Sequence, residues 1–165
     1  MDFTHLHVHS HYSLMDGLCS PEELLTAAKN AGQTAMAITD HGTLSGVIEF
    51  YKSAKAKGIK PIVGMEAYVS ARKHTDKSSA EDRNPYHLTL IAKNKAGYKN
   101  LMKLSTIASL EGFYYKPRID HELLEKYSEG LIATSTCIGG HIPSLLLSEN
   151  FDEAEIILNR MLKIF

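Results

Sequence analysis

Few features of this sequence point to an extracellular or membrane protein. Only two of its 165 residues are cysteines, Cys19 and Cys137. That is too few for a disulfide framework, and a cytosolic setting would keep them reduced. No apolar run approaches the roughly 20 residues that a membrane span needs, and the first residues lack the basic flank and apolar stretch of a signal peptide. We therefore expect a cytoplasmic protein without a membrane partner.

Neither sign of charge is in excess. Lysine and arginine number 18, aspartate and glutamate number 19, and the net charge is −1. This balance gives no electrostatic case for a free-standing nucleic-acid binder. A hydrophobic fraction of 44% and a charged fraction of 22% are typical of a soluble globular protein, and the length suffices for one domain with its own core. Nine histidines are many for this length.

Short apolar segments alternate with amphipathic ones along the chain. Strands are predicted within residues 3–9, 34–39, 59–69, 87–92 and 131–134, and helices within 20–32, 44–57, 98–110 and 151–165. This order indicates an α/β fold of mainly parallel strands joined by crossover helices. The polar segment 70–85 is interpreted as a mobile surface loop. About five strands are too few to close a parallel barrel, which needs about eight, so we expect the front part of a larger domain.

His7 and His9 form the first candidate for a metal site. They stand two residues apart in the first predicted strand, so their imidazoles share one face and can bind the same ion. A lone strand histidine is more often a hydrogen-bonded core residue, which is our interpretation of His5. Two imidazoles on one face favour a metal.

The later predicted strands add further side chains of the types that bind metals. Asp16 lies in the loop after the first strand, His41 follows the second, Glu66 ends the third, His87 lies at the fourth, and Cys137 follows the fifth. Each alone has an ordinary explanation, such as a turn, an exposed strand end or a core cysteine. Because functional groups in parallel α/β folds collect at one rim of the sheet, we expect these side chains to converge. Mixed nitrogen, oxygen and sulfur ligands suit zinc or a similar divalent ion.

The other histidines are not among the predicted ligands. His74 lies in the polar segment and is expected to be solvated, and His121 follows the N-cap residue Asp120 on an expected surface helix. His11 is a neighbour of the first-strand pair. His141 lies in a Gly-Gly turn close enough to Cys137 to line the same site.

Taken in order, these motifs resemble those of the PHP (polymerase and histidinol phosphatase) domain. The matching segments are residues 5–10 (HLHVHS), 39–42 (TDHG), 64–68 (GMEAY), 87–88 (HL) and 134–137 (TSTC). Other segments are similar to the N-terminal region of bacterial replicative DNA polymerase III alpha subunits: 15–17 (MDG), 43–46 (TLSG), 58–64 (GIKPIVG), 97–101 (GYKNL) and 111–118 (EGFYYKPR). Stand-alone phosphatases of the family are not expected to share this second set.

The resemblance implies a distorted, TIM-like (β/α)7 barrel that holds up to three divalent metal ions. His7 and His9 would hold one ion, with Glu66 bridging to a neighbour. Asp16 and His41 would hold a second, and Glu66, His87 and Cys137 a third. Zinc is expected, with manganese, iron or magnesium as alternatives. The family's later Asp-x-His motif is absent from this sequence, so we expect residues 1–165 to be the N-terminal part of the domain, with an incomplete cluster.

The resemblance also implies a function in DNA replication. Metal-assisted phosphoester hydrolysis is expected, as 3′→5′ exonuclease proofreading or pyrophosphate hydrolysis, with His9, Asp16 and Glu66 as catalytic residues. The expected partners are DNA, reached through the full-length polymerase, and other replicase subunits. One alternative is a non-catalytic, metal-stabilised scaffold of the polymerase that docks a proofreading subunit. Another is a stand-alone phosphatase for a compound such as histidinol phosphate, against which the polymerase-like segments argue.

Overall fold

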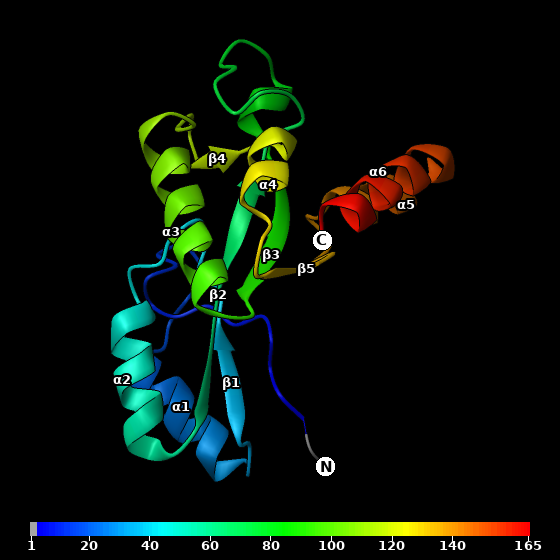
Figure 1. The fold of residues 1–165 in the computed structure, drawn as a ribbon. Coiled ribbons are helices and arrows are strands. Elements are labelled where there is room, and N and C mark those ends of the chain that lie inside the picture. Colours follow the sequence, from blue (N-terminus) through cyan, green and yellow to red (C-terminus); the bar gives the residue numbers. More distant parts are fainter. Residues whose placement is uncertain (1–2) are drawn as a thin grey trace.

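The structure, a computed structural model, describes residues 3–165. Its helices are α1 (Pro21–Asn30), α2 (Val47–Lys57), α3 (Lys95–Leu110), α4 (His121–Tyr127), α5 (His141–Leu147) and α6 (Phe151–Ile164), with a 3₁₀ turn η1 (Glu81–Arg83). Its strands are β1 (Ala35–Ile38), β2 (Lys60–Val69), β3 (Tyr86–Ala92), β4 (Arg118–Ile119) and β5 (Leu131–Thr134). Figure 1 shows their arrangement. The elements predicted after residue 20 are present, whereas β4, α5 and η1 were not predicted.

Local chemistry explains where α1 begins and where α2 ends. Ser20 and Glu23 form a capping box before α1, in which the Ser20 hydroxyl accepts from the Glu23 N–H and the Glu23 carboxylate accepts from the Ser20 N–H. α2 ends at Gly58, whose left-handed φ of 73° costs glycine little and other residues more.

The prediction of mainly parallel strands is wrong for β3. The strand order is β1-β2-β3-β5, with β4 beside β2. β1 and β4 run parallel to β2, but β3 is antiparallel to both β2 and β5. A parallel return from β2 to β3 would need a crossover element such as a helix packed against the sheet. The connection at 70–85 contains no helix longer than the three-residue η1, so the chain turns back along β2 instead.

Residues 3–9, predicted as the first strand, are extended but do not form a regular strand. It follows β1 through hydrogen bonds from Ala37 N to His5 O at 2.9 Å and from Thr39 N to Val8 O at 2.8 Å. Val8 N donates to the Thr39 side chain, at 2.8 Å, instead of to a β1 carbonyl. A side-chain acceptor interrupts the regular ladder, yet it still holds residues 5–9 beside β1.

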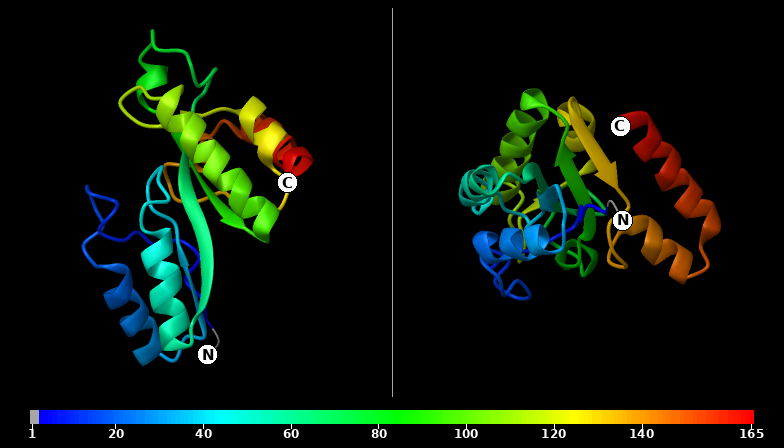
Figure 2. Two further views of the ribbon diagram at one scale, coloured as in Figure 1. Left: turned by 60° about the vertical axis from the view of Figure 1, so that its left-hand side comes forward. Right: turned by 90° about the horizontal axis from the view of Figure 1, so that it is seen from below.

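Two apolar clusters support the sheet. One fills the space between β2, β3, α3 and α4, centred on Leu90, Leu101 and Leu104. The other lies among α1, α2 and β1, centred on Leu25 and Phe50. α1 and α2 pack side by side at one end of the molecule, and α5 and α6 form a separate pair beside β5 (Figure 2). In residues 3–165, none of the helices combines the length and apolar character that a bilayer crossing requires.

Segment 70–85 lies mostly at the surface, as expected for a surface loop, but several of its residues are anchored to the domain. The Asp82 carboxylate is buried and accepts hydrogen bonds from Arg72 at 2.7 Å and from the N–H groups of Ser78 and Ser79 at 2.8 Å. The fully buried Arg118 donates to four backbone carbonyls, three of them in this segment. His74 is also held, because its Nδ1 lies 2.5 Å from the Asp120 carboxylate. Sequence reasoning missed these contacts because Arg118 and Asp120 lie far along the chain.

Candidate metal centre

Glu66 is the centre of the candidate site. Its side chain on β2 is only 1% exposed, and four imidazoles surround its carboxylate. The closest nitrogen–oxygen distances are 3.3 Å at His7, 3.2 Å at His9, 2.8 Å at His41 and 3.0 Å at His87. We call Glu66 and these four histidines the Glu66 cage.

The backbone brings His41 and His87 to Glu66 from opposite sides of β2. His41 follows β1 and forms a parallel bridge with Glu66, in which Glu66 N donates to Asp40 O at 3.1 Å and Gly42 N donates to Glu66 O at 2.9 Å. His87, on β3, stands opposite Tyr68 in the antiparallel ladder. His7 and His9 reach the same point from the extended segment, where they flank Val8.

The imidazole rings pack against one another as well as against the carboxylate. His9 stacks on His41 with ring centroids 4.1 Å apart and planes 10° from parallel. Tyr68 continues this stack on His41 at 5.7 Å and meets the edge of His87 at 5.2 Å. These contacts restrict the rotation of the rings and keep their nitrogens directed at Glu66.

Asp16 and Cys137 complete the set of seven residues predicted from the sequence. The Asp16 carboxylate lies 2.9 Å from Nε2 of His41, on the side away from Glu66. The Cys137 sulfur lies 3.5 Å from both Glu66 Oε1 and His87 Nδ1. All seven predicted side chains thus form one connected group, although they come from five separate parts of the sequence.

Several atoms of the cage lack hydrogen-bond partners. His7 Nε2, His41 Nδ1 and Glu66 Oε2 are buried in the described part of the chain without a hydrogen bond. The nearby nitrogens and oxygens are close enough to interact but are not aligned as donor and acceptor. A shared cation would satisfy such converging lone pairs, and the donor set of imidazole nitrogen, carboxylate oxygen and thiol sulfur suits zinc or a related ion.

Three overlapping groups have ligand atoms within 4.8 Å of one another and can each hold a metal ion. The first is His7, His9 and Glu66; the second is His9, Asp16 and His41; the third is His41, Glu66 and His87. His9, His41 and Glu66 each belong to two groups, so neighbouring ions would share ligands.

The cage keeps its central carboxylate ionised. Burial alone would raise the pKa of Glu66, but contacts with His41, His7, His87 and His9 outweigh burial and hold that pKa far below its usual range. The same contact with Glu66 raises the pKa of His41. Burial raises the pKa of the Cys137 thiol, so this sulfur needs a nearby cation to become a thiolate ligand.

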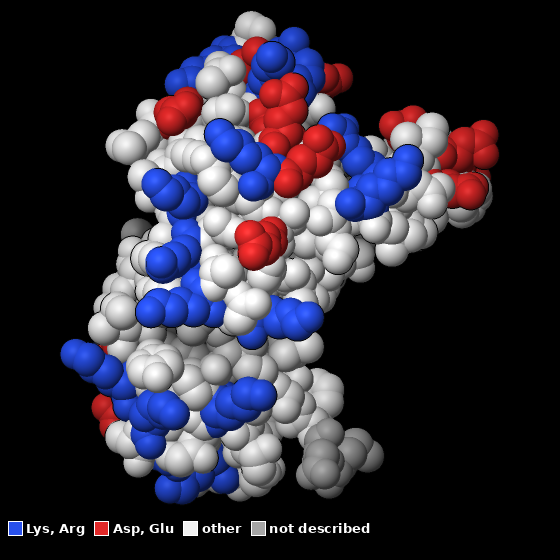
Figure 3. All heavy atoms as spheres, in the orientation of Figure 1, with Lys and Arg blue, Asp and Glu red and all other residues white. Residues whose placement is uncertain are grey.

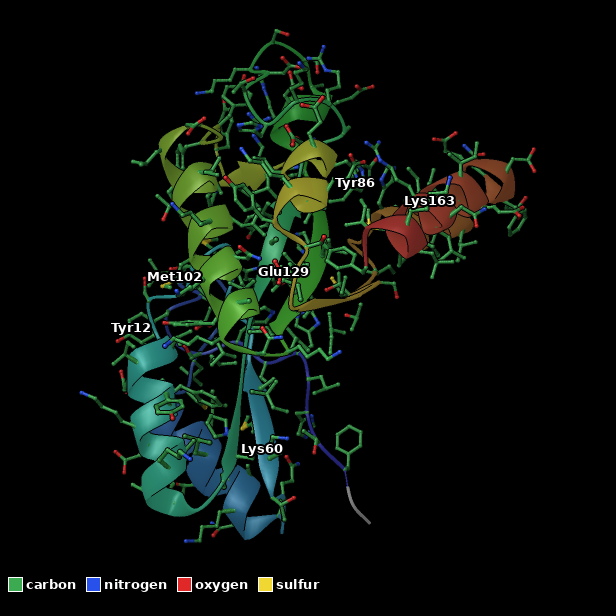
Figure 4. The ribbon with its side chains drawn as sticks, viewed as in Figure 1. Tyr12, Lys60, Tyr86, Met102, Glu129 and Lys163 are labelled. Carbon is green, nitrogen blue, oxygen red and sulfur yellow. The ribbon has the colours of Figure 1, made fainter. Side chains whose placement is uncertain are left out.

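Sequence reasoning missed the residue that fixes the loop of Asp16. Asp40 is buried and accepts hydrogen bonds from Ser10 N at 2.7 Å and from the hydroxyls of Ser10 and Ser13 at 2.8 Å. The Ser13 hydroxyl in turn lies 3.4 Å from His9 Nδ1 and accepts from His41 N. The Tyr12 hydroxyl donates a 3.0 Å hydrogen bond to the Glu49 carboxylate and so joins the loop to α2. Tyr12 is labelled in Figure 4. The carboxylate and serines were visible in the sequence, but their pairing was not.

Two other histidines lie apart from the cage. His121, expected on a surface helix, is only 7% exposed, and burial lowers its pKa to about 4. His141 stacks on Tyr86 at 3.8 Å, and it belongs to none of the three ligand groups found among residues 3–165.

Comparisons with known proteins agree with the motifs. The sequence profile of the PHP domain matches residues 5–165. DNA polymerase III subunit alpha of Borreliella burgdorferi is 54% identical over 93% of this chain and 13% of that protein. The same subunit of Thermus aquaticus is 47% identical over 100% of this chain and 14% of that protein. The chain therefore spans 13–14% of the length of these relatives. A solved amidohydrolase from Chromobacterium violaceum has a TM-score of 0.46 and 25% identity, covering 64% of this chain and 32% of that one.

Proposed function

The chain belongs to the PHP-domain family, and we propose that it is the N-terminal part of the PHP domain of a bacterial DNA polymerase III alpha subunit that hydrolyses phosphoesters. The observation that carries this proposal is the buried Glu66 carboxylate among four imidazoles whose lone pairs converge. The 54% identity to an alpha subunit supports the polymerase context. The further strands of a distorted barrel and the last metal motif would lie outside residues 1–165.

The three groups of neighbouring ligand atoms support part of the ligand set that the resemblance implies, and Cys137, which is in none of them, is added because its sulfur lies 3.5 Å from both Glu66 and His87. His7, His9 and Glu66 would hold one ion, Asp16 and His41 a second, and Glu66, His87 and Cys137 a third. Zinc fits this mixture of donor atoms best. Since Glu66 itself belongs to the first and third groups, it would be a ligand shared by neighbouring ions.

The proposed reaction is the hydrolysis of a phosphodiester, as in 3′→5′ exonuclease proofreading, or of pyrophosphate. Bound divalent ions supply a water of lowered pKa and offset the negative charge of phosphate oxygens. Glu66 stays ionised at neutral pH and holds the imidazoles in place. Asp16 is 52% exposed, so its carboxylate stands where the site opens to solvent and to a substrate. DNA would reach the site through the complete polymerase in the cytoplasm, with other replicase subunits as partners.

A scaffold that docks a proofreading subunit is the second candidate. The observation in its favour is the apolar outer face of α6, where Ile156 is 58% exposed and Leu162 is 70% exposed. Such a face suits packing against another protein surface. A scaffold without metal would not require a buried carboxylate with unpaired imidazole nitrogens around it, whereas a metal-stabilised scaffold would use the same residues, so an assay of hydrolysis separates the two candidates.

The test uses the full natural chain that contains this domain. We expect the purified protein to contain divalent metal and to shorten a 5′-labelled oligonucleotide from its 3′ end, and a chelator should abolish the shortening. His9→Ala should abolish it as well, because His9 belongs to two ligand groups. Lys126→Ala, on the exposed side of α4, is the matched control. Metal binding without any hydrolysis of oligonucleotide or pyrophosphate would favour the scaffold, and unchanged hydrolysis by His9→Ala would refute the assignment of the site.

A further inference from the structure

Lys116 lies beside the Glu66 cage without belonging to it. Its ammonium nitrogen is 4.4 Å from the centroid of the Tyr68 ring, a distance typical of a cation–π contact. Tyr68 is itself stacked on His41. The series Lys116, Tyr68 and His41 therefore places a lysine one ring away from the metal ligands.

The backbone around Lys116 is held in an unusual conformation. Tyr114 N donates to Lys116 O at 3.1 Å, which closes a tight turn. The turn forces Tyr115 to a φ of 60°, a left-handed conformation that costs a non-glycine residue about 1 kcal/mol or more. Such strain persists only where the surrounding structure determines it, and functional sites are where it concentrates.

Close packing fixes this turn against the site. Gly42, directly after His41, has a φ of 62°, and a Cβ at this position would stand 2.7 Å from the Pro117 ring and 3.2 Å from the Tyr68 ring. Only glycine allows the backbone beside His41 to approach Pro117 so closely. Because Pro117 follows Lys116 directly, this contact sets the position of Lys116 relative to the cage.

The charge of Lys116 has no carboxylate partner among residues 3–165, whereas Lys57 pairs with Glu22 and Arg160 pairs with Glu125. The carboxylate of Glu66 in the cage and that of Asp16 beside His41 would repel an anionic substrate. A lysine ammonium is a compact charge with three donors and is well suited to phosphate oxygens.

We propose that Lys116 binds a non-bridging phosphate oxygen of the substrate at the rim of the Glu66 cage. This inference rests on the proposed hydrolytic function and names the group of the substrate that this turn recognises. The cation–π contact with the Tyr68 ring restrains the Lys116 side chain before the substrate arrives, which reduces the loss of side-chain freedom on binding.

The experiment measures the binding of inorganic phosphate to the full natural chain loaded with zinc, by titration calorimetry. Lys116→Met keeps most of the aliphatic chain and removes the charge, and we expect its affinity for phosphate to fall about tenfold or more. Lys116→Arg should retain most of the affinity, since it keeps a donor cation. Lys99→Met is the matched control, because Lys99 is an exposed residue of α3, and Figure 3 shows that exposed basic side chains are common on the surface around α3 and α2.

The outcomes separate this proposal from the proposed function. Metal content that stays unchanged in Lys116→Met, together with weaker phosphate binding, supports a direct contact with the substrate. Equal phosphate affinity in Lys116→Met and the unmodified chain would overturn the proposal, as would an unmodified chain that binds no phosphate. A chain that binds phosphate through Lys116 but cleaves no phosphoester would contradict the hydrolytic function alone.

Discussion

Replacing Asp40 by alanine should loosen the loop that carries Asp16 and positions His9. The Asp40 side chain is 2% exposed and accepts three hydrogen bonds of 2.7–2.8 Å from Ser10 and Ser13. A hydrogen bond to a charged group contributes about 1.5–3 kcal/mol, and its loss leaves a buried donor unsatisfied. Because bonds that share one carboxylate are not additive, we expect the free energy of unfolding to fall by about 3–5 kcal/mol.

Urea denaturation of the 165-residue chain measures this loss, and mass spectrometry after dialysis measures the metal retained. Asp40→Asn keeps the shape and one acceptor oxygen, so it should lose less stability than Asp40→Ala. Glu155→Ala, an exposed change on α6, should stay within about 0.5 kcal/mol of the unmodified chain. Our reasoning about loop positioning would be refuted if Asp40→Ala lost stability but bound metal as tightly as the unmodified chain.

Two further predictions concern metal removal and pH. A chelator should lower the thermal unfolding midpoint of the unmodified chain, because an ion that binds only the folded state stabilises it. Added zinc should no longer raise this midpoint in Glu66→Gln. A rise as large as that of the unmodified chain would contradict the central role of Glu66. Burial holds the pKa of His121 near 4, below its ordinary 6.5, so between these values the unfolded chain binds a proton that the folded chain does not. The free energy of unfolding should therefore fall from pH 6.5 to pH 4, by up to about 3 kcal/mol. When urea midpoints are plotted against pH over this range, His121→Gln should show a smaller decrease than the unmodified chain.

Spacing along the chain was sufficient to predict the parts of the site that depend on local geometry. His7 and His9 share a face because neighbouring residues of any extended segment alternate, whether or not the segment pairs as a strand. His41 and Glu66 were placed near each other because β1 and β2 are parallel neighbours, and the carboxyl ends of such strands meet at one rim.

The direction of β3 and the partners of buried charges were beyond sequence reasoning. An apolar strand has the same side-chain pattern whether it runs parallel or antiparallel to its neighbour. The sequence of residues 86–92 therefore does not indicate the direction of β3 relative to β2. His87 reaches Glu66 because β3 is antiparallel to β2, which sets the first residues of β3 beside the last residues of β2. The anchoring of segment 70–85 depends on Arg118, more than 30 residues further along the chain, and no local pattern reports such a contact.

The energetics of the Glu66 cage argue that it is built for a ligand. Burying a carboxylate is costly unless its oxygens are well paired, and Glu66 Oε2 and two imidazole nitrogens are buried without hydrogen bonds. Apolar side chains of similar volume would make a more stable junction between β1, β2 and β3. Contact with Glu66 raises the pKa of His41, which favours a proton on this ring. A divalent ion would compete with such a proton for the ring nitrogen, so the contacts within the Glu66 cage tie its affinity for metal to pH.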